Sequence, residues 1–392
     1  MKLLLYSHFF APSIGGVETI VMSLARGLAE LRAENGAREF AVTLVTQTPR
    51  ENFDDAGLPF AVIRQTNFWK LRKLVRDADV VHVAGPALAP LVLGFIARKP
   101  VVIEHHGFQV ICPTGQLLIE SRQEPCPGHF MAGRHSECWK CDPALGWFSA
   151  RKLWLFTFVR RFLSKRAAAN IVPTSWLGGQ LMLPRMSTIH HGLVQIEPLK
   201  KGDAKLLSGT ANIVFLGRLV TTKGAPVLLE AAKILSRQEL DFALVFIGDG
   251  PERANLEAVA KQPPLLGRVQ FTGRLSQAEL ETKLQHASMV VVPSLGGEVF
   301  GLVVAENMQR GLPVVASDLG AFVEVLGEAG KTFAVGDAGE LARCIANLMK
   351  SPEEMTSLEA QAAQRAQEQF GLKAMIAAHA SAYREAERRE TT

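Results

Sequence analysis

The chain has 392 residues, which is enough for two domains of ordinary size, each with its own core. Hydrophobic residues at 48% and charged residues at 21% are typical of a folded globular protein and exclude a disordered one. A net charge of +5 and a pI of about 9.0 favour anionic partners such as sugar nucleotides or acidic lipid head groups, but do not indicate nucleic acid.

The sequence also gives an expectation about location. No apolar run reaches the roughly 20 residues needed to cross a bilayer. The start of the chain, Met1–Phe10, lacks the basic segment and the cleavage site of a signal peptide. We therefore expect a cytoplasmic protein, in which the five cysteines are thiols or metal ligands rather than disulfides.

Short apolar runs alternate with longer amphipathic segments along the whole chain. In the first half, strands are predicted at Lys2–Tyr6, Phe40–Val45, Asp79–Val83, Val101–Glu104 and Asn170–Val172. A helix is predicted at Val17–Arg32, where apolar residues recur at helical spacing. In the second half, strands are predicted at Asn212–Leu216, Phe242–Ile247, Val269–Phe271, Met289–Val292 and Val314–Ala316. This alternation predicts an α/β protein with two doubly wound, Rossmann-like domains.

The boundary between these domains is predicted near Glu197–Gly209, where proline, glycine and lysines interrupt the pattern. We expect an N-terminal domain over residues 1–198, with a cysteine-rich insertion at 107–143, and a C-terminal domain over residues 199–370. The polar helical segment at 371–392 is expected to pack back on the first domain. Doubly wound sheets bind ligands at the carboxyl ends of their strands, so the site is expected in a cleft between the domains.

Four glycine-bearing segments of the second half follow predicted strands. They are Gly217–Gly224, Gly248–Pro251, Gly273–Leu275 and Pro293–Glu306. Each alone is more often a turn, but all four in order favour a site for a phosphorylated ligand. Arg218 and Lys223 offer positive charge to a diphosphate. Glu306 is suited to accept hydrogen bonds from a ribose, and Glu298 lies closer to the group that is transferred.

These motifs resemble glycosyltransferase family 4, the glycosyl transferases group 1, which are retaining enzymes of the GT-B fold. In that fold two Rossmann-like domains face each other across a cleft. The Glu-x7-Glu signature of the family is intact from Glu298 to Glu306. A Gly-Arg…Lys-Gly element matches residues 217–224, and a Gly-x-Pro-Val-Val-Ala run matches residues 311–316.

The resemblance implies a nucleoside-diphosphate sugar as donor and no catalytic metal. The donor-binding residues that it implies are Gly15, Gly16, Arg218, Lys223, Arg274, Phe300, Gly301, Leu302 and Glu306. The catalytic residues that it implies are His105, Arg218, Lys223 and Glu298. Within these sets, Arg218 and Lys223 would hold the diphosphate and the chain near Arg274 would contact the base. Glu306 would hold the ribose, and Glu298 the hydroxyls of the donor sugar.

In the first half, Gly15 and Gly16 follow the first strand and open a helix, as does the Gly-Gly-x-Glu loop of the same family. A glycine pair on its own is more often a structural turn. His105 falls where the family has a histidine near the donor sugar and acceptor, and histidine can move a proton near neutral pH. His106 takes a position that is more often Asp, so either of the two could face the cleft. His82, inside a strand, is predicted to be a packed core residue.

Four of the five cysteines lie in the insertion: Cys112, Cys126, Cys138 and Cys141. The last two have the Cys-x2-Cys spacing of zinc knuckles, and four thiolates would complete a structural zinc site. His129 and His135 are substitute ligands. The other intervals are irregular, so thiols without metal in a flexible insertion are an equal alternative. A metal there would order the insertion and shape the acceptor side.

The segment Trp147–Arg166 interleaves aromatic and basic residues. Helices of this kind lie on anionic lipid surfaces. The favoured interpretation is a helix that is buried on one face against the first sheet, with solvated cations. Peripheral contact with an anionic membrane stays open, because enzymes of the resembling family often act on lipid-linked acceptors.

The sequence therefore predicts a retaining hexosyltransferase that uses a nucleoside-diphosphate sugar and a saccharide or lipid-linked saccharide acceptor. Its products would be cell-surface polysaccharide, lipopolysaccharide or glycolipid, made in the cytoplasm or at the inner face of the membrane. One alternative is a nucleotide-sugar epimerase, which would turn over donor without an acceptor. Another is a non-catalytic partner subunit with the same fold. The intact Glu298 and Glu306 favour transfer over both.

Overall fold

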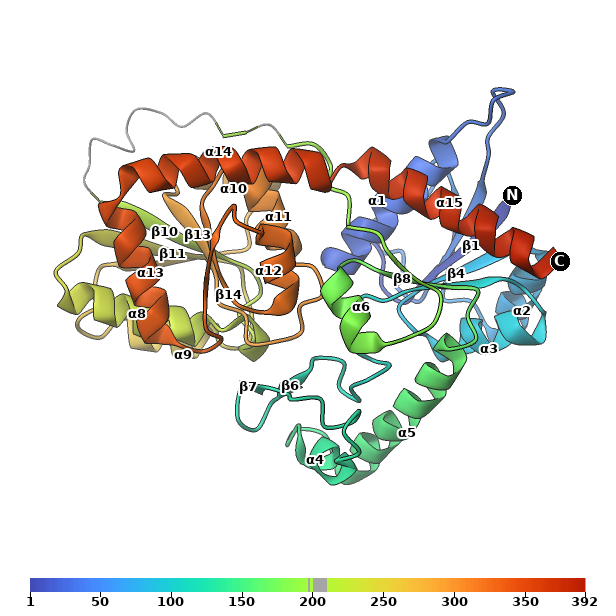
Figure 1. Ribbon diagram of the computed structural model, residues 1–392, viewed down its shortest axis with the longest axis horizontal. Coiled ribbons are helices and arrows are strands. Elements are labelled where there is room, and N and C mark those ends of the chain that lie inside the picture. Colours follow the sequence, from blue (N-terminus) through green and yellow to red (C-terminus); the bar gives the residue numbers. More distant parts are fainter. Residues whose placement is uncertain (197, 200–209, 392) are drawn as a thin grey trace. The chain divides into compact units, whose positions relative to one another are not determined.

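The structure is a computed structural model that describes residues 1–196, 198–199 and 210–391. It comprises two compact units, each with its own parallel sheet (Figure 1). The first unit is Met1–Gly115, Gly128–Val194 and Phe370–Thr392, and the second is Gln116–Pro127 and Gln195–Gln369. Residues 116–127 of the cysteine-rich insertion thus belong to the second unit. The predicted boundary segment Glu197–Gly209 lies outside the described residues except at positions 198 and 199.

The first sheet has seven strands in the order β3-β2-β1-β4-β5-β8-β9, all parallel. They are β1 (Lys2–Ser7), β2 (Ala41–Thr46), β3 (Ala61–Arg64), β4 (Val80–Ala84), β5 (Val101–Glu104), β8 (Ala169–Val172) and β9 (Met186–Thr188). The central strands β4 and β5 are buried at every residue, as expected for a parallel sheet with both faces covered. The strand order reverses between β1 and β4, which is where such sheets bind ligands.

The helices of the first unit are α1 (Gly16–Glu30), α2 (Phe68–Asp77), α3 (Leu88–Ile96), α4 (His135–Lys140), α5 (Trp147–Ser164), α6 (Ser175–Leu181) and α15 (Leu372–Thr391). The buried face of α1 includes Ile20, Leu24 and Leu28, at the helical spacing seen in the sequence. The last helix, α15, packs against α1, β4 and β5 (Figure 1). Its residue Tyr383 is fully buried there, so the end of the chain completes the core of the first unit.

The second sheet has six parallel strands in the order β12-β11-β10-β13-β14-β15. They are β10 (Ala211–Leu216), β11 (Phe242–Ile247), β12 (Val269–Gly273), β13 (Met289–Val292), β14 (Val314–Ser317) and β15 (Lys331–Phe333). Here the order reverses between β10 and β13. The predicted α/β architecture of two doubly wound sheets is confirmed.

The helices of the second unit are the 3-10 helix η1 (Thr221–Lys223), α8 (Ala225–Arg237), α9 (Arg253–Ala260), α10 (Gln277–Leu284), α11 (Leu302–Gln309), α12 (Gly320–Leu326), α13 (Ala338–Lys350) and α14 (Pro352–Gln369). A short hairpin of the insertion, β6 (Leu118–Ile119) and β7 (Glu124–Pro125), also belongs to this unit. Among the described residues, no helix combines the length and the apolar character needed to cross a membrane.

Candidate functional site

The loops after β10 and β13 flank the point where the strand order of the second sheet reverses. The two loops touch at a position that only glycine fits. Gly224 has a φ of 64°, and a Cβ on it would lie 1.9 Å from the carbonyl oxygen of Pro293. Nearby, the backbone N–H of Leu295 donates to the carbonyl of Thr222 at 2.8 Å. This close approach holds Lys223 beside the loop that carries Glu298.

An ion pair joins the two loops. Lys223 Nζ lies 2.5 Å from Glu298 Oε1. The Ser294 hydroxyl donates to the same oxygen at 2.9 Å. The Ser317 hydroxyl, at the end of β14, donates to the backbone carbonyl of Ser294 at 2.6 Å. The side chains of Lys223 and Glu298 are 27% and 11% exposed, so the pair is sheltered from water but still reachable by a ligand.

Helix α11 begins directly after this loop, at Leu302. Its N-cap residue Gly301 has a φ of 91°, and a Cβ there would lie 2.5 Å from the Phe322 ring. Since none of the described side chains caps this terminus, its first N–H groups are open to an anion. Glu306 lies in the second turn of the helix. Burial raises the pKa of its carboxyl group, and the nearby Arg310 opposes that effect only in part.

The remaining predicted residues of the second unit also follow its strands. Arg218 comes after β10 and Arg274 after β12, and both are exposed. Phe300 is 1% exposed, so its ring belongs to the core. The structure therefore brings Lys223 and Glu298 into contact, and it places Arg218 and Arg274 at the carboxyl ends of strands in the same sheet.

Sequence reasoning missed several residues that position this site. Ser294 and Ser317 orient Glu298 and its loop, and their only signal is a small polar residue at the end of an apolar strand. The side chain of Arg310 is only 2% exposed. Its guanidinium binds the Glu281 carboxylate, with an Nη2–Oε1 distance of 2.8 Å. This contact fixes α11 to α10 and had no recognisable signal in the sequence.

In the first unit, α1 begins at Gly16, after the loop that follows β1. The N-cap residue Gly15 has an extended backbone, and a Cβ on it would lie 2.5 Å from the Glu18 carboxylate. Glu18 therefore folds back over the start of the helix, where its charge suits the exposed N–H groups. An anionic ligand at Gly15 and Gly16 would have to displace this carboxylate.

His105 lies in the core of the first unit and is fully buried. Its Nε2 atom lies 2.9 Å from Asn170 Oδ1 on β8, and burial lowers its pKa to about 4. These contacts favour a packing role over contact with a substrate. The neighbouring His106 is partly exposed and faces Glu104. His82 is buried in β4, as predicted.

The cysteine cluster receives no support as a zinc site. Cys112, Cys138 and Cys141 are buried in the first unit, whereas Cys126 belongs to the second. Within the described part of the chain, the one group of three metal-binding side chains whose ligand atoms all lie within 4.8 Å of one another contains no cysteine.

The aromatic–basic helix α5 is buried over only a small part of its surface. It packs on α4 and α3, and its buried residues are only Ala150, Thr157 and Ser164. Large apolar side chains remain exposed along it: Trp147, Phe148, Leu155, Phe158, Val159 and Phe162. Leu163, near the end of the helix, packs against the core cluster that includes the strands of the first sheet. The expected burial of one face against that sheet is therefore limited to this end, and most aromatic residues of α5 remain in solvent.

Two family models match the chain. Residues 14–193 match the model described as Glycosyltransferase Family 4, and residues 200–365 match the one described as Glycosyl transferases group 1. Among curated relatives, a phosphatidyl-myo-inositol mannosyltransferase of Mycolicibacterium smegmatis is 34% identical over 170 residues, covering 42% of this chain and 43% of that protein. A glycogen synthase of Mycobacterium tuberculosis is 30% identical over 270 residues, covering 66% and 62%. The chain thus matches about half the length of these relatives.

Solved structures resemble the whole chain. The Anabaena protein HepE, in complex with UDP and glucose, has a TM-score of 0.71 at 18% identity, covering 97% of this chain and 98% of that one. The sucrose-phosphate synthase of Thermosynechococcus elongatus has a TM-score of 0.73 at 21% identity, covering 98% of both. These likenesses establish the fold, and the family models cover both of its halves. The chain belongs to glycosyltransferase family 4, the glycosyl transferases group 1, and has their GT-B fold.

Proposed function

We propose that this protein is a retaining hexosyltransferase that uses a nucleoside-diphosphate sugar and a saccharide or lipid-linked saccharide acceptor. The products would be cell-surface polysaccharide, lipopolysaccharide or glycolipid. The observation that carries the proposal is the Lys223–Glu298 pair beside the open N-terminus of α11, at the switch point of the second sheet. The complexes of HepE with UDP and UDP-glucose support a sugar nucleotide as donor.

In this proposal the second unit holds the donor. Lys223, Arg218 and the first N–H groups of α11 bind the diphosphate, where helix and side-chain charges add. Glu306 accepts hydrogen bonds from the ribose, and the chain around Arg274 contacts the base. Glu298 accepts hydrogen bonds from the donor sugar, and its contact with Lys223 couples the sugar subsite to the diphosphate subsite.

The transfer step needs no protein nucleophile. The bond between the anomeric carbon and the diphosphate oxygen breaks, and the acceptor oxygen bonds to the same carbon on the same face. The acceptor proton passes to the departing diphosphate. Lys223 and Arg218 stabilise the negative charge that develops on that leaving group, and such stabilisation is commonly the largest catalytic effect.

A panel of sugar nucleotides, each with and without saccharide acceptors, tests the proposal. One donor should be consumed with an acceptor, and the anomeric configuration of the product, read by NMR, should match that of the donor. Consumption of donor to a new sugar nucleotide without acceptor would indicate the epimerase instead. Absence of thermal stabilisation by every nucleotide would indicate a partner subunit without a donor site.

We also infer that α5 contacts an anionic membrane surface at the cytoplasmic face. Trp147 and Phe148 are 66% and 75% exposed, and the Arg151 guanidinium lies 3.9 Å from the centre of the Trp147 ring. Exposed aromatic rings beside arginines suit the interface of acidic lipids. The named lipid substrate of the mannosyltransferase relative is consistent with this location.

Flotation with vesicles separates this inference from the chemistry. Binding should require anionic lipid and weaken with salt, and the double substitution Trp147→Ser with Phe148→Ser should abolish it. Leu266→Ser, at a 66% exposed residue of the second unit, is the matched control and should bind like wild type. Equal binding of the double variant and the control would refute a role for α5.

A further inference from the structure

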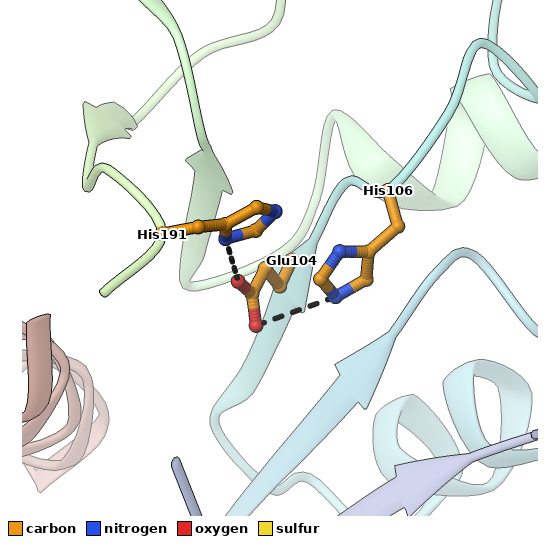
Figure 2. Close-up of side chains that lie close together, drawn as sticks. All are labelled: Glu104, His106 and His191. Atoms are coloured by element: carbon orange, nitrogen blue, oxygen red, sulfur yellow. Dashed lines mark ion pairs between the residues drawn. The ribbon is translucent and has the colours of Figure 1, made fainter. Parts of the chain in front are cut away.

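The first unit contains a buried carboxylate surrounded by imidazole rings. Glu104, at the end of β5, is 0% exposed. Four histidines face it: His82 of β4, His106 after β5, His191 after β9 and His379 of α15. Figure 2 shows the carboxylate between His106 and His191. Neither the catalytic proposal nor the family comparison assigns this cluster a role.

The carboxylate of Glu104 is not satisfied by hydrogen bonds. Neither of its oxygens accepts one from any described residue. A buried carboxylate is costly unless positive charge beside it repays the desolvation of its own charge. A cation among the surrounding rings would remove that cost. The four histidines approach from four separate elements, so the cluster is built by the fold and not by one exposed loop.

The distances fit ligands that share one ion. The contacts of the carboxylate with the four rings are 3.3 Å to His82, 3.5 Å to His106, 3.7 Å to His191 and 3.6 Å to His379. With metal–ligand bonds of 2.0–2.2 Å, two ligands on a tetrahedral ion lie about 3.3–3.6 Å apart. One ligand atom each from Glu104, His106 and His191 lies within 4.8 Å of the other two. A small inward shift would therefore close these three around an ion.

Two of the histidine rings, His379 and His82, form hydrogen bonds through the nitrogen that points away from Glu104. His379 Nδ1 lies 2.9 Å from the Met375 carbonyl, which can only accept, so this nitrogen carries the hydrogen. In the neutral ring, Nε2 then presents a lone pair to the Glu104 carboxylate. The Tyr383 hydroxyl lies 2.9 Å from His82 Nδ1, and either of these two groups can be the donor. These hydrogen bonds fix how the His379 and His82 rings stand beside the carboxylate that would bind the ion.

We propose that Glu104, His106 and His191 bind a divalent transition-metal ion of the zinc type. Two imidazoles and a carboxylate are a ligand set that zinc accepts, with a fourth position left for another ligand. His82 and His379 are not among these three ligands, but their rings face the same Glu104 carboxylate. Binding would fasten β5, the loop after it and the segment after β9 to one another.

Metal analysis of the full chain, purified without chelator, and titration of the stripped protein with Zn²⁺ or Co²⁺ test this site. One ion per chain is expected, and bound Co²⁺ should show d–d absorption without thiolate charge-transfer bands. Glu104→Gln and His191→Asn should each weaken binding by more than the roughly 10- to 100-fold that loss of an outer ligand partner costs. His286→Asn, at an exposed histidine, is the matched control.

A double variant, Cys138→Ser with Cys141→Ser, distinguishes this site from a thiolate site and should leave Co²⁺ binding unchanged. Circular dichroism shows whether each variant is folded. If the folded wild type binds neither Zn²⁺ nor Co²⁺, the proposal is overturned, and the cluster is then a set of buried ion pairs without a metal. Binding that survives both Glu104→Gln and His191→Asn, or that disappears with the two cysteines, overturns it equally. None of these outcomes depends on transferase activity.

Discussion

Glu298→Gln isolates the charge of Glu298 from its volume. The glutamine oxygen can still accept the hydrogen bond from Ser294, but it no longer forms an ion pair with Lys223 Nζ at 2.5 Å. Hydrogen bonds to charged groups contribute about 1.5–3 kcal/mol, and exposed ion pairs about 1 kcal/mol or less. Because Lys223 is 27% exposed, we expect a loss near the middle, about 1–1.5 kcal/mol. In a unit of this size that lowers the melting temperature by roughly 2–6 °C.

The effect on transfer should be much larger. If the Glu298 charge holds the donor sugar in the transition state, turnover falls by roughly 100- to 1,000-fold. Affinity for the nucleoside diphosphate alone should not fall, because Lys223 is released to bind phosphate. The assay is the initial rate of transfer, combined with a thermal melt and calorimetric titration of the diphosphate. Turnover, melting temperature and affinity then report three separate quantities.

The chain offers a matched control for this substitution. Lys331 Nζ also lies 2.5 Å from a glutamate, Glu354, on the second unit. Glu354→Gln removes a pair of the same length at a site with no proposed role in chemistry, so its turnover should equal that of wild type. Near-wild-type turnover in Glu298→Gln would refute the role of Glu298. A fall of similar size in both variants would show that the loss is structural.

Three further predictions concern particular contacts. Gly224→Ala should lower the free energy of unfolding by roughly 1–3 kcal/mol in chemical denaturation, because φ is 64° at this position and the new Cβ would clash with the carbonyl of Pro293. Unchanged stability would mean that the loops after β10 and β13 do not touch. Burial raises the folded pKa of Glu306, so wild type loses stability as pH rises above 4.5 through that higher value, and melting curves of Glu306→Gln should lack this loss. The hydrogen bond from Arg64 lowers the pKa of Asp55, so Asp55→Asn should lower the free energy of unfolding by about 1–2 kcal/mol above pH 3.8. The difference from wild type should vanish as acid protonates Asp55, and a pH-independent difference would contradict the pairing.

The strands that sequence patterns identified are those inside each sheet, together with the edge strand β12. β4 and β13 are buried at every residue and therefore appear as continuous apolar runs. In the two large sheets the missed strands are β3, β9 and β15, which lie at sheet edges. They have only three or four residues each, and Phe333 is the one buried position among them, so neither their length nor their pattern separates them from loops.

The site divides in the same way. Its glycines and glutamates stand in a recognisable local order, so the second-unit loops were predictable from sequence. The contact between Lys223 and Glu298 joins residues 75 positions apart, and it depends on how two strands pair. The burial of His105 and the exposure of α5 are likewise set by packing between elements, which residue spacing does not encode. The cluster around Glu104 draws on β4, β5 and α15, and no local motif announces it.

The central claim is that the loops after β10 and β13 bind the diphosphate of a sugar nucleotide. Calorimetric titration of wild type and Lys223→Met with uridine, guanosine and adenosine diphosphates tests it most directly. We predict that one of the three binds wild type with 1:1 stoichiometry. Affinity in Lys223→Met should be weaker by roughly 10-fold or more, as expected for loss of a charged hydrogen bond of about 1.5–3 kcal/mol. Equal affinity in the two proteins would contradict the claim.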